Sequence, residues 1–93
     1  MLLVIYDVSD NSRRLRLSKE LERMGLSRVQ RSAFVGPGGS ALFKELSSRV
    51  VATVNRSDDV VHMVRVSEAE WASAVVIGRP VTGPEVKGYE ILV

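Results

Sequence analysis

The chain opens with a run of apolar positions that predicts a covered strand. Residues Leu2–Val8 are apolar, β-branched or aromatic except for Asp7, and polar residues follow directly. Asp7 should therefore lie at the carboxyl end of a buried strand that faces the start of a helix. Such a junction is a common place for a ligand or metal ion to bind. The next four residues, Ser9-Asp10-Asn11-Ser12, are of the types that begin helices.

Apolar residues at helical spacing predict the helix that follows. In Arg13–Met24 the residues Leu17, Leu21 and Met24 share one face, which should pack on the core. Gly25 is the expected end of this helix, because glycine readily adopts the backbone conformation that stops one.

A second helix is expected after the glycine-rich stretch 36–39, which predicts a loop. Ser40 is its expected cap. Its apolar positions at helical spacing are Leu42, Phe43, Leu46, Val50 and Val54. β-Branched residues near its end lower the helix propensity of the final turn.

The remaining apolar segments predict strands. Leu26–Gly36 is expected as one bent strand or as two short ones around Gln30-Arg31, and Asp59–Val66 alternates as a strand. After a turn or short helix at 67–71, two further strands are predicted at Ala74–Ile77 and Val86–Val93. This order predicts an α+β fold, a ferredoxin-like βαββαβ sandwich with two helices on one face of the sheet and extra C-terminal strands.

The length of 93 residues allows one small domain, spanning 1–93. A domain of this size gains stability by oligomerisation, so we expect a homodimer. Within the domain, 79–93 is expected to form a loop and a C-terminal strand that pairs with the sheet edge of the partner subunit.

Composition excludes several kinds of site. The chain has no cysteine, which excludes disulfides, thiolate zinc sites and a cysteine nucleophile. Its single histidine, His62, cannot form an imidazole metal cage within one chain. No apolar run approaches the ~20 residues that cross a bilayer, and the first residues read as a strand and not as a signal peptide. We therefore expect a cytoplasmic protein with no membrane partner.

Positive charge is concentrated in the first third of the chain. Residues 1–31 contain seven Lys/Arg and four acids, a net charge of +3, whereas the rest contains six against seven, a net charge of −1. A basic face of this kind attracts phosphate groups. The structural alternative is a solvated helix face.

One combination of motifs is more specific. Tyr6-Asp7 ends the first strand, a basic helix ends at Gly25, and Arg28-Val29-Gln30 is followed by Ser32 and Phe34. At these spacings the first 36 or so residues resemble the CRISPR-associated protein 2 family, which the rest of the chain matches by element order and length. One residue departs from the family pattern, since Val35 stands where many members carry an acid. Without that acid the chain has one potential metal ligand fewer, which weakens a catalytic interpretation.

The resemblance implies a ferredoxin-like homodimer that exchanges C-terminal strands and holds one divalent ion, Mg²⁺ or Mn²⁺, near the two copies of Asp7. It also implies a role in spacer acquisition. That role is either metal-dependent endonuclease cleavage of RNA or DNA, or a non-catalytic bridge that binds duplex DNA between CRISPR-associated protein 1 integrase subunits. Outside the family, a ferredoxin-like regulatory or toxin-type dimer that binds RNA or a small anion is the competing hypothesis.

The predicted site residues form overlapping groups. Asp7 is the expected metal ligand. The residues expected to serve catalysis are Asp7, Arg14, Arg16, Arg28 and Phe34. Those expected to bind nucleic acid are Arg13, Arg14, Arg16, Arg28 and Arg31. Cations in the first turn of a helix oppose its dipole, so the expected position of Arg14 and Arg16 favours phosphate contact over a stabilising role.

Structural alternatives stay open at several of these positions. Asp7 could simply end the strand, and Phe34 is as well suited to a dimer core as to the wall of an active site. Tyr6 alternates with Asp7, so it should face the core or support the site. Asp10 and Asn11 are expected to be helix caps and not metal ligands.

Overall fold

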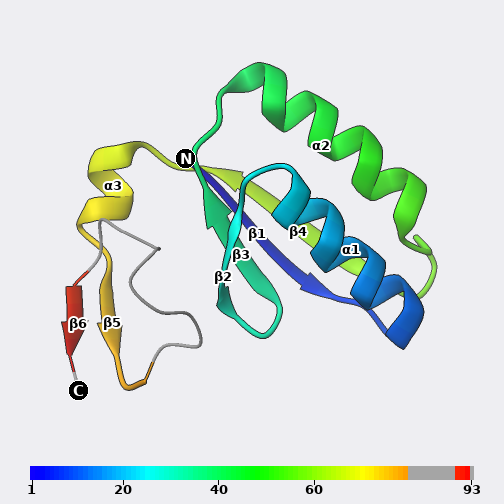
Figure 1. Cartoon of the computed structure of the whole chain (residues 1–93), viewed down its shortest axis with the longest axis horizontal. Coiled ribbons are helices and arrows are strands. Elements are labelled where there is room, and N and C mark those ends of the chain that lie inside the picture. Colours follow the sequence, from blue (N-terminus) through cyan, green and yellow to red (C-terminus); the bar gives the residue numbers. More distant parts are fainter. Residues whose placement is uncertain (80–89, 93) are drawn as a thin grey trace.

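The computed structural model describes residues 1–79 and 90–92 (Figure 1). The elements, in chain order, are β1 (Leu2–Asp7), α1 (Asn11–Arg23), β2 (Ser27–Gln30), β3 (Ala33–Gly36), α2 (Ser40–Thr53), β4 (Val60–Arg65), α3 (Glu68–Ala72), β5 (Val75–Ile77) and β6 (Glu90–Leu92).

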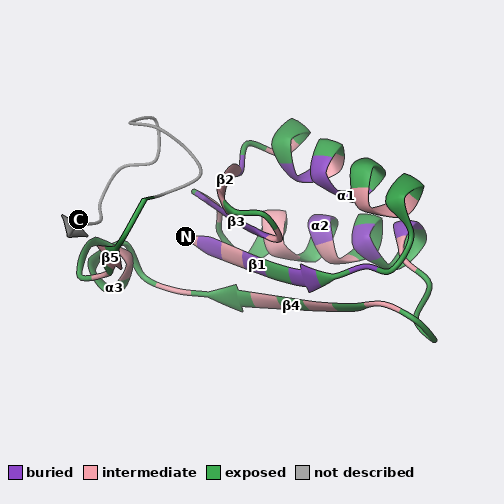
Figure 2. Cartoon of the chain, turned by 90° about the horizontal axis from the view of Figure 1, so that it is seen from below, coloured by how far each residue is buried: buried purple, intermediate pink, exposed green. Residues whose placement is uncertain are grey.

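The main sheet has four antiparallel strands in the order β2-β3-β1-β4. Helices α1 and α2 both lie on one face of it, and the described residues leave the other face of β1 and β4 without a helix (Figure 2). This order and layering confirm the predicted ferredoxin-like βαββαβ fold.

Strand β1 separates these two faces residue by residue, because successive side chains of a strand point in opposite directions. Leu2, Val4 and Tyr6 are buried toward the helices, whereas Ile5 is 44% exposed and Asp7 is exposed. Asp7 pairs with Val60 at the start of β4.

The core lies between the sheet and the two helices. Its largest fully buried side chains are Phe34, Leu2, Leu17, Leu21, Leu46 and Val4. Burying one such side chain stabilises the fold by roughly 1.5–3 kcal/mol. The opposite face of β1 and β4 carries Ile5, Asp7, Val60, His62 and Val64, and we call it the helix-free face.

Helix α1 begins and ends where the sequence indicates. Asp10 is the N-cap, and its side chain accepts a hydrogen bond from the Arg13 amide at 2.9 Å. Asn11, one of the two expected caps, is instead the first helical residue. Gly25 follows the helix with a φ of +95°, a conformation that a side chain would strain. Arg16 consequently lies in the second turn, where the helix dipole acts on it less than predicted.

The segment between the helices forms two short strands, which settles the alternative that the sequence left open. The hairpin of β2 and β3 turns at Arg31 and Ser32, and its register shifts between Arg28 and Gln30, the mark of a β-bulge. Gly36, at the end of β3, passes very close to the connection after α1. A Cβ at Gly36 would lie 2.9 Å from the Gly25 carbonyl oxygen and from the Leu26 Cα.

The expectation that Ser40 caps α2 was wrong. Gly39 is the N-cap and supplies no side-chain hydrogen bond, while the Ser40 hydroxyl accepts one from Arg65 Nη1 at 2.8 Å. The Ser40 hydroxyl is instead bound by an arginine of β4, 25 positions later in the chain, and the local sequence does not reveal this contact. The helix nevertheless continues to Thr53 through its β-branched residues.

The C-terminal part forms a second sheet. Strands β5 and β6 pair in parallel within the chain. Residues 80–89 and 93 are outside the described residues, so most of the loop and strand expected at 79–93 is not covered, and its pairing with a partner subunit stays a prediction. Within the described part, no helix has the length and apolar character needed to span a bilayer.

Candidate nucleic-acid and metal site

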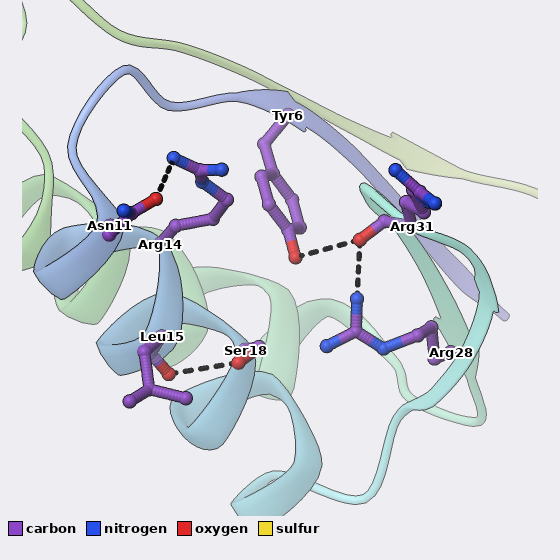
Figure 3. A pocket seen from close by; sticks show the side chains of 7 residues that line it. All are labelled: Tyr6, Asn11, Arg14, Leu15, Ser18, Arg28 and Arg31. Carbon is purple, nitrogen blue, oxygen red and sulfur yellow. Dashed lines mark hydrogen bonds between the residues drawn. The ribbon is translucent and has the colours of Figure 1, made fainter.

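A shallow pocket lies where α1 faces β1 and the turn of the β2–β3 hairpin (Figure 3). Its volume is about 230 Å³. Its lining residues are Tyr6, Asn11, Arg14, Leu15, Ser18, Arg28 and Arg31. Three of these carry guanidinium groups and none is an acid, so we call it the arginine pocket.

Tyr6 reaches the pocket because it lies on the helix-facing side of β1. Its ring stacks on Phe34 with 6.2 Å between centroids, and its hydroxyl donates to the Arg31 carbonyl at 3.4 Å. Burial raises the pKa of the Tyr6 hydroxyl, an effect that the nearby Arg28 partly opposes. Tyr6 is therefore neutral at neutral pH and keeps an O–H that can donate.

Arg28 is held against the hairpin by two contacts. Its Nη1 donates to the Arg31 carbonyl, and its guanidinium carbon lies 4.8 Å from the centroid of the Phe34 ring. The second contact has cation–π geometry. Figure 3 shows the Arg28 guanidinium and the Tyr6 hydroxyl converging on the same carbonyl oxygen.

Arg14 enters the pocket from α1 and leaves one donor unused. Its Nη2 donates to Asn11 Oδ1 at 2.5 Å. Its Nε is buried and has no hydrogen-bond partner among the described residues. A buried donor left unsatisfied costs about 1–3 kcal/mol, so such a group calls for a partner that the chain itself does not supply.

Phe34 lies beneath the pocket and not in it. Its side chain is 0% exposed and packs in the core between sheet and helices. The expectation of a catalytic Phe34 was wrong, because a side chain with no accessible surface cannot touch a substrate. It faces the helices and so does not belong to the helix-free face either. Its contribution is to support Tyr6 and Arg28 from below.

Arg13 is committed to an ion pair that the sequence did not reveal. Its Nε and Nη2 donate to the two carboxylate oxygens of Asp59 at 2.8 and 3.2 Å. Asp59 also accepts from the backbone amides of Ser9 and Asn55 at 3.1 and 2.8 Å, and its side chain is 0% exposed. We call this group the Asp59 clamp. These contacts do not support the predicted nucleic-acid contact of Arg13, whose guanidinium is already paired.

The same hydrogen bonds act on the titration of the clamp. Donation from the Arg13 guanidinium, with the two backbone amides, holds the pKa of the Asp59 carboxyl well below its usual range. Asp59 therefore stays ionised across the physiological pH range and joins the end of β1 to the start of β4.

Asp7 lies apart from the arginines. It is exposed on the helix-free face, whereas Tyr6, its neighbour, points to the pocket on the other side. Within one chain the alternation of β1 separates Asp7 from Arg14 and Arg28, and the roles predicted for these residues stay predictions. Arg16 is exposed on α1 outside the pocket lining, and Arg31 lines the pocket from the hairpin turn.

The described residues contain no group of three acidic, histidine or cysteine side chains that could hold a metal ion. Asp7 alone offers one carboxylate, while Mg²⁺ in proteins is usually bound by one or two carboxylates together with phosphate and water. A single chain thus gives an incomplete metal site. Asp7 supplies one of the one or two carboxylates that such an ion usually takes.

The pocket residues that sequence reasoning missed carry a recognisable signal. Asn11, Leu15 and Ser18 join Arg14 on one side of α1 because 11, 14, 15 and 18 are three or four positions apart. Tyr6 was assigned to the core or to a supporting role, and the structure gives it a supporting position with a hydroxyl at the pocket. The helical spacing, considered together with the strand alternation, contained this information.

Comparison with known proteins places the chain in a family. Residues 1–74 match the family model described as CRISPR associated protein Cas2. The chain belongs to the Cas2 family. A relative from Thermofilum pendens, named CRISPR-associated endoribonuclease Cas2, is 37% identical over 92 residues that cover 98% of either chain. The competing hypothesis of a regulatory or toxin-type dimer outside this family is thereby set aside.

Two further Cas2 relatives bear on assembly and fold. A Thermoproteus tenax protein named CRISPR-associated endonuclease Cas1/endonuclease Cas2 fusion is 34% identical over 67 residues, which cover 72% of this chain and 25% of that protein. The crystal structure of Streptococcus pyogenes Cas2 aligns with a TM-score of 0.65 at 24% identity, covering 72% of this chain and 86% of that chain. The second likeness shows that the fold is shared.

Proposed function

We propose that this Cas2 chain forms a homodimer that binds nucleic acid during CRISPR spacer acquisition and cleaves RNA or DNA in a metal-dependent reaction. Family membership and the names of the endoribonuclease relatives support a nuclease. The observation that carries the proposal is the position of Asp7. It is an exposed carboxylate on a face that is otherwise largely apolar.

The helix-free face has the composition of a surface that a second copy covers. Ile5, Val60 and Val64 are 44%, 48% and 42% exposed, and they share this face with Asp7, Ile5 on β1 and the two valines on β4. Clustered apolar side chains on a small domain are stabilised by association. A twofold contact through this face would bring the two copies of Asp7 toward one axis.

Two Asp7 carboxylates meet the need that one leaves open. Oxygen ligands of this kind suit Mg²⁺ or Mn²⁺, and an ion bound there would supply an activated water for phosphodiester hydrolysis. The chain's own cations have a separate task. Arg14, Arg16, Arg28 and Arg31 are placed to bind the phosphates of the strand and hold it in register.

Substitution of Asp7 tests the catalytic part. The dimer is incubated with RNA and DNA oligonucleotides of one sequence, in Mg²⁺ and in EDTA. Asp7→Asn should lower the cleavage rate by at least about 100-fold, since it removes both metal-binding charges of the dimer. Asp58→Asn, which removes an exposed carboxylate from the turn before β4, is the matched control. Equal rates for wild type and Asp7→Asn would reject the nuclease and point to a contaminating enzyme.

The dimer has its own test. Ile5→Lys introduces a charge into the centre of the helix-free face and should give monomers at concentrations where the wild type sediments as a dimer. Val51→Lys, at a similarly exposed apolar position on α2, should leave the mass unchanged. A wild type that sediments as a monomer throughout would remove the basis for a shared metal site.

A non-catalytic bridge is the second candidate, in which the dimer binds duplex DNA between integrase subunits. The observation favouring it is the relative whose name joins Cas1 and Cas2 in one protein. Val35 in place of an acid, with Asp7 as a lone carboxylate, also suits a chain that need not cleave. Co-purification with the Cas1 protein of the same organism tests this role. If Asp7→Asn keeps spacer acquisition intact, the bridge is the function.

A further inference from the structure

We propose that the arginine pocket binds the terminal phosphate of a nucleic-acid strand, a phosphate monoester, in preference to an internal phosphodiester. This rests on the proposed function for its choice of nucleic acid as the ligand. It does not rest on cleavage at Asp7. The pocket then serves as an anchor for a strand end.

Charge is the first argument. A phosphate monoester carries between one and two negative charges at neutral pH, close to two above its second pKa near 6, whereas an internal phosphodiester carries one. The pocket lining offers Arg14, Arg28 and Arg31 with no acid among the described lining residues. Glu22, outside the lining, is the nearby acid that adds to the raised pKa of Tyr6. This excess of positive charge suits a group with the higher negative charge.

The hydrogen-bond donors are the second argument. Arg14 lines the pocket, and its guanidinium group would donate to a phosphate oxygen there. Arg28 is held in place by the Arg31 carbonyl and the Phe34 ring, so little of its freedom remains to be lost on binding. The single O–H of Tyr6 already donates to the Arg31 carbonyl, so it would have to leave that carbonyl to donate to the anion.

Size and shape form the third argument. A volume of about 230 Å³ is below the range of roughly 300–1,000 Å³ in which sites for drug-sized ligands occur. It suits a phosphate with part of a sugar and not a nucleotide together with its base. Leu15, 57% exposed at the rim, offers an apolar contact for the sugar. The preference for a chain end over an internal phosphodiester therefore rests on charge and not on enclosure.

Location distinguishes this anchor from the cleavage site. Tyr6 points to the pocket, whereas Asp7 points to the helix-free face of the same strand. A strand end held in the pocket is therefore not the phosphodiester nearest to Asp7 of that chain. The anchor and any cut are separated by the thickness of the sheet.

Two oligonucleotides with equal numbers of phosphate groups test the inference. A 5′-phosphorylated pentanucleotide and a hexanucleotide with hydroxyl ends each carry five, and a 3′-phosphorylated pentanucleotide completes the set. Affinities are measured by calorimetry with EDTA present, so that no cleavage occurs. We expect at least one of the two phosphorylated pentanucleotides to bind about tenfold more tightly than the hexanucleotide. Equal affinity of all three would overturn the proposal, whatever the cleavage assay shows.

Variants assign the preference to the pocket. Arg14→Gln and Arg28→Gln should each reduce the tenfold ratio to below about threefold, and Tyr6→Phe should reduce it less. Arg56→Gln, which removes an exposed arginine from the turn before β4, should retain the full ratio. Circular dichroism checks that each variant is folded. A ratio that survives in both Arg14→Gln and Arg28→Gln would place the terminal phosphate elsewhere and overturn the assignment.

Discussion

Tyr6 and Asp7 are neighbours in the chain but belong to two different surfaces. On the helix side of β1, Tyr6 meets Phe34, Arg14 and Arg28, all positioned by elements of the same chain. On the helix-free side, Asp7 is exposed with Ile5, Val60 and His62, and the described residues contain no group of three acidic, histidine or cysteine side chains that could hold a metal ion. One surface is complete within a single copy. The other presents one carboxylate, and the metal site proposed for it draws on a second copy.

The comparison shows that a motif can be contiguous in sequence and divided in space. A Tyr-Asp pair at a strand end supplies one side chain to each face of the sheet, because the side-chain period of a strand is two. The proposed phosphate and metal sites can therefore be altered separately by mutation, although Tyr6 and Asp7 are adjacent.

Phe34→Ala should break the helix side most severely. Deleting a fully buried phenylalanine costs about 3–5 kcal/mol, a large part of the 5–15 kcal/mol that stabilises a typical domain. The expected fall in Tm is more than about 12 °C, measured by circular dichroism. Val51→Ala, at an exposed apolar position, should stay within about 0.5 kcal/mol of wild type. A similar small effect for Phe34→Ala would mean that the pocket is not supported from below.

Asp59→Asn should destabilise the connection between the end of β1, the start of α1 and the start of β4, which lies between the two surfaces. The clamp joins Ser9, two residues after Asp7, to Arg13, which precedes Arg14. Because the pKa of Asp59 is lowered in the folded state, its carboxylate stabilises the fold fully above its ordinary pKa of about 3.9. That stabilisation is lost as the pH falls from there toward the lower folded-state value.

Thermal unfolding at several pH values measures this effect. The Tm of Asp59→Asn should lie several degrees below that of wild type from pH 5 to pH 8. The difference should then narrow as the pH falls below about 4. Asp58→Asn, its exposed neighbour, should stay near wild type at pH 7. A constant difference down to pH 2 would show that the lost interaction does not depend on ionisation.

Arg16→Gln should have the smallest effect. Arg16 is exposed on α1 outside the pocket, so a contact with an internal phosphate would be electrostatic and independent of sequence. Removing it should lower the slope of log Kd against log salt by about 0.7–0.9, while the preference for a terminal phosphate is retained. An unchanged slope would exclude Arg16 from the binding surface.

Much of the fold could be predicted from local pattern. The unbroken apolar run of β1, the capping residue Asp10 and the stop at Gly25 each act within a few residues, so they survive into the structure unchanged. The division of 26–36 into two strands was left open, since a bulge depends on register with a neighbouring strand.

The site was harder to predict because its decisive contacts are distant in sequence. The sequence shows that Arg13 is basic, but not that Asp59, 46 positions later, occupies its guanidinium. Phe34 belongs to a motif of chemically relevant residues, and only its position on the helix side of β3 identifies it as core. The alternation that separates Asp7 from Tyr6 was readable. Which side of the sheet carries the arginines could be known only once α1 was placed on one face.

Gly36 lets the main chain of β3 pack directly against the main chain that follows α1. Since a Cβ there would fall 2.9 Å from backbone atoms of Gly25 and Leu26, the end of β3 and the chain leaving α1 meet without any intervening side chain. The spacing between α1, which carries Arg14, and the hairpin, which carries Arg28, is thus set independently of side-chain rotamers. A side chain at position 36 would push the end of β3 away from the chain leaving α1.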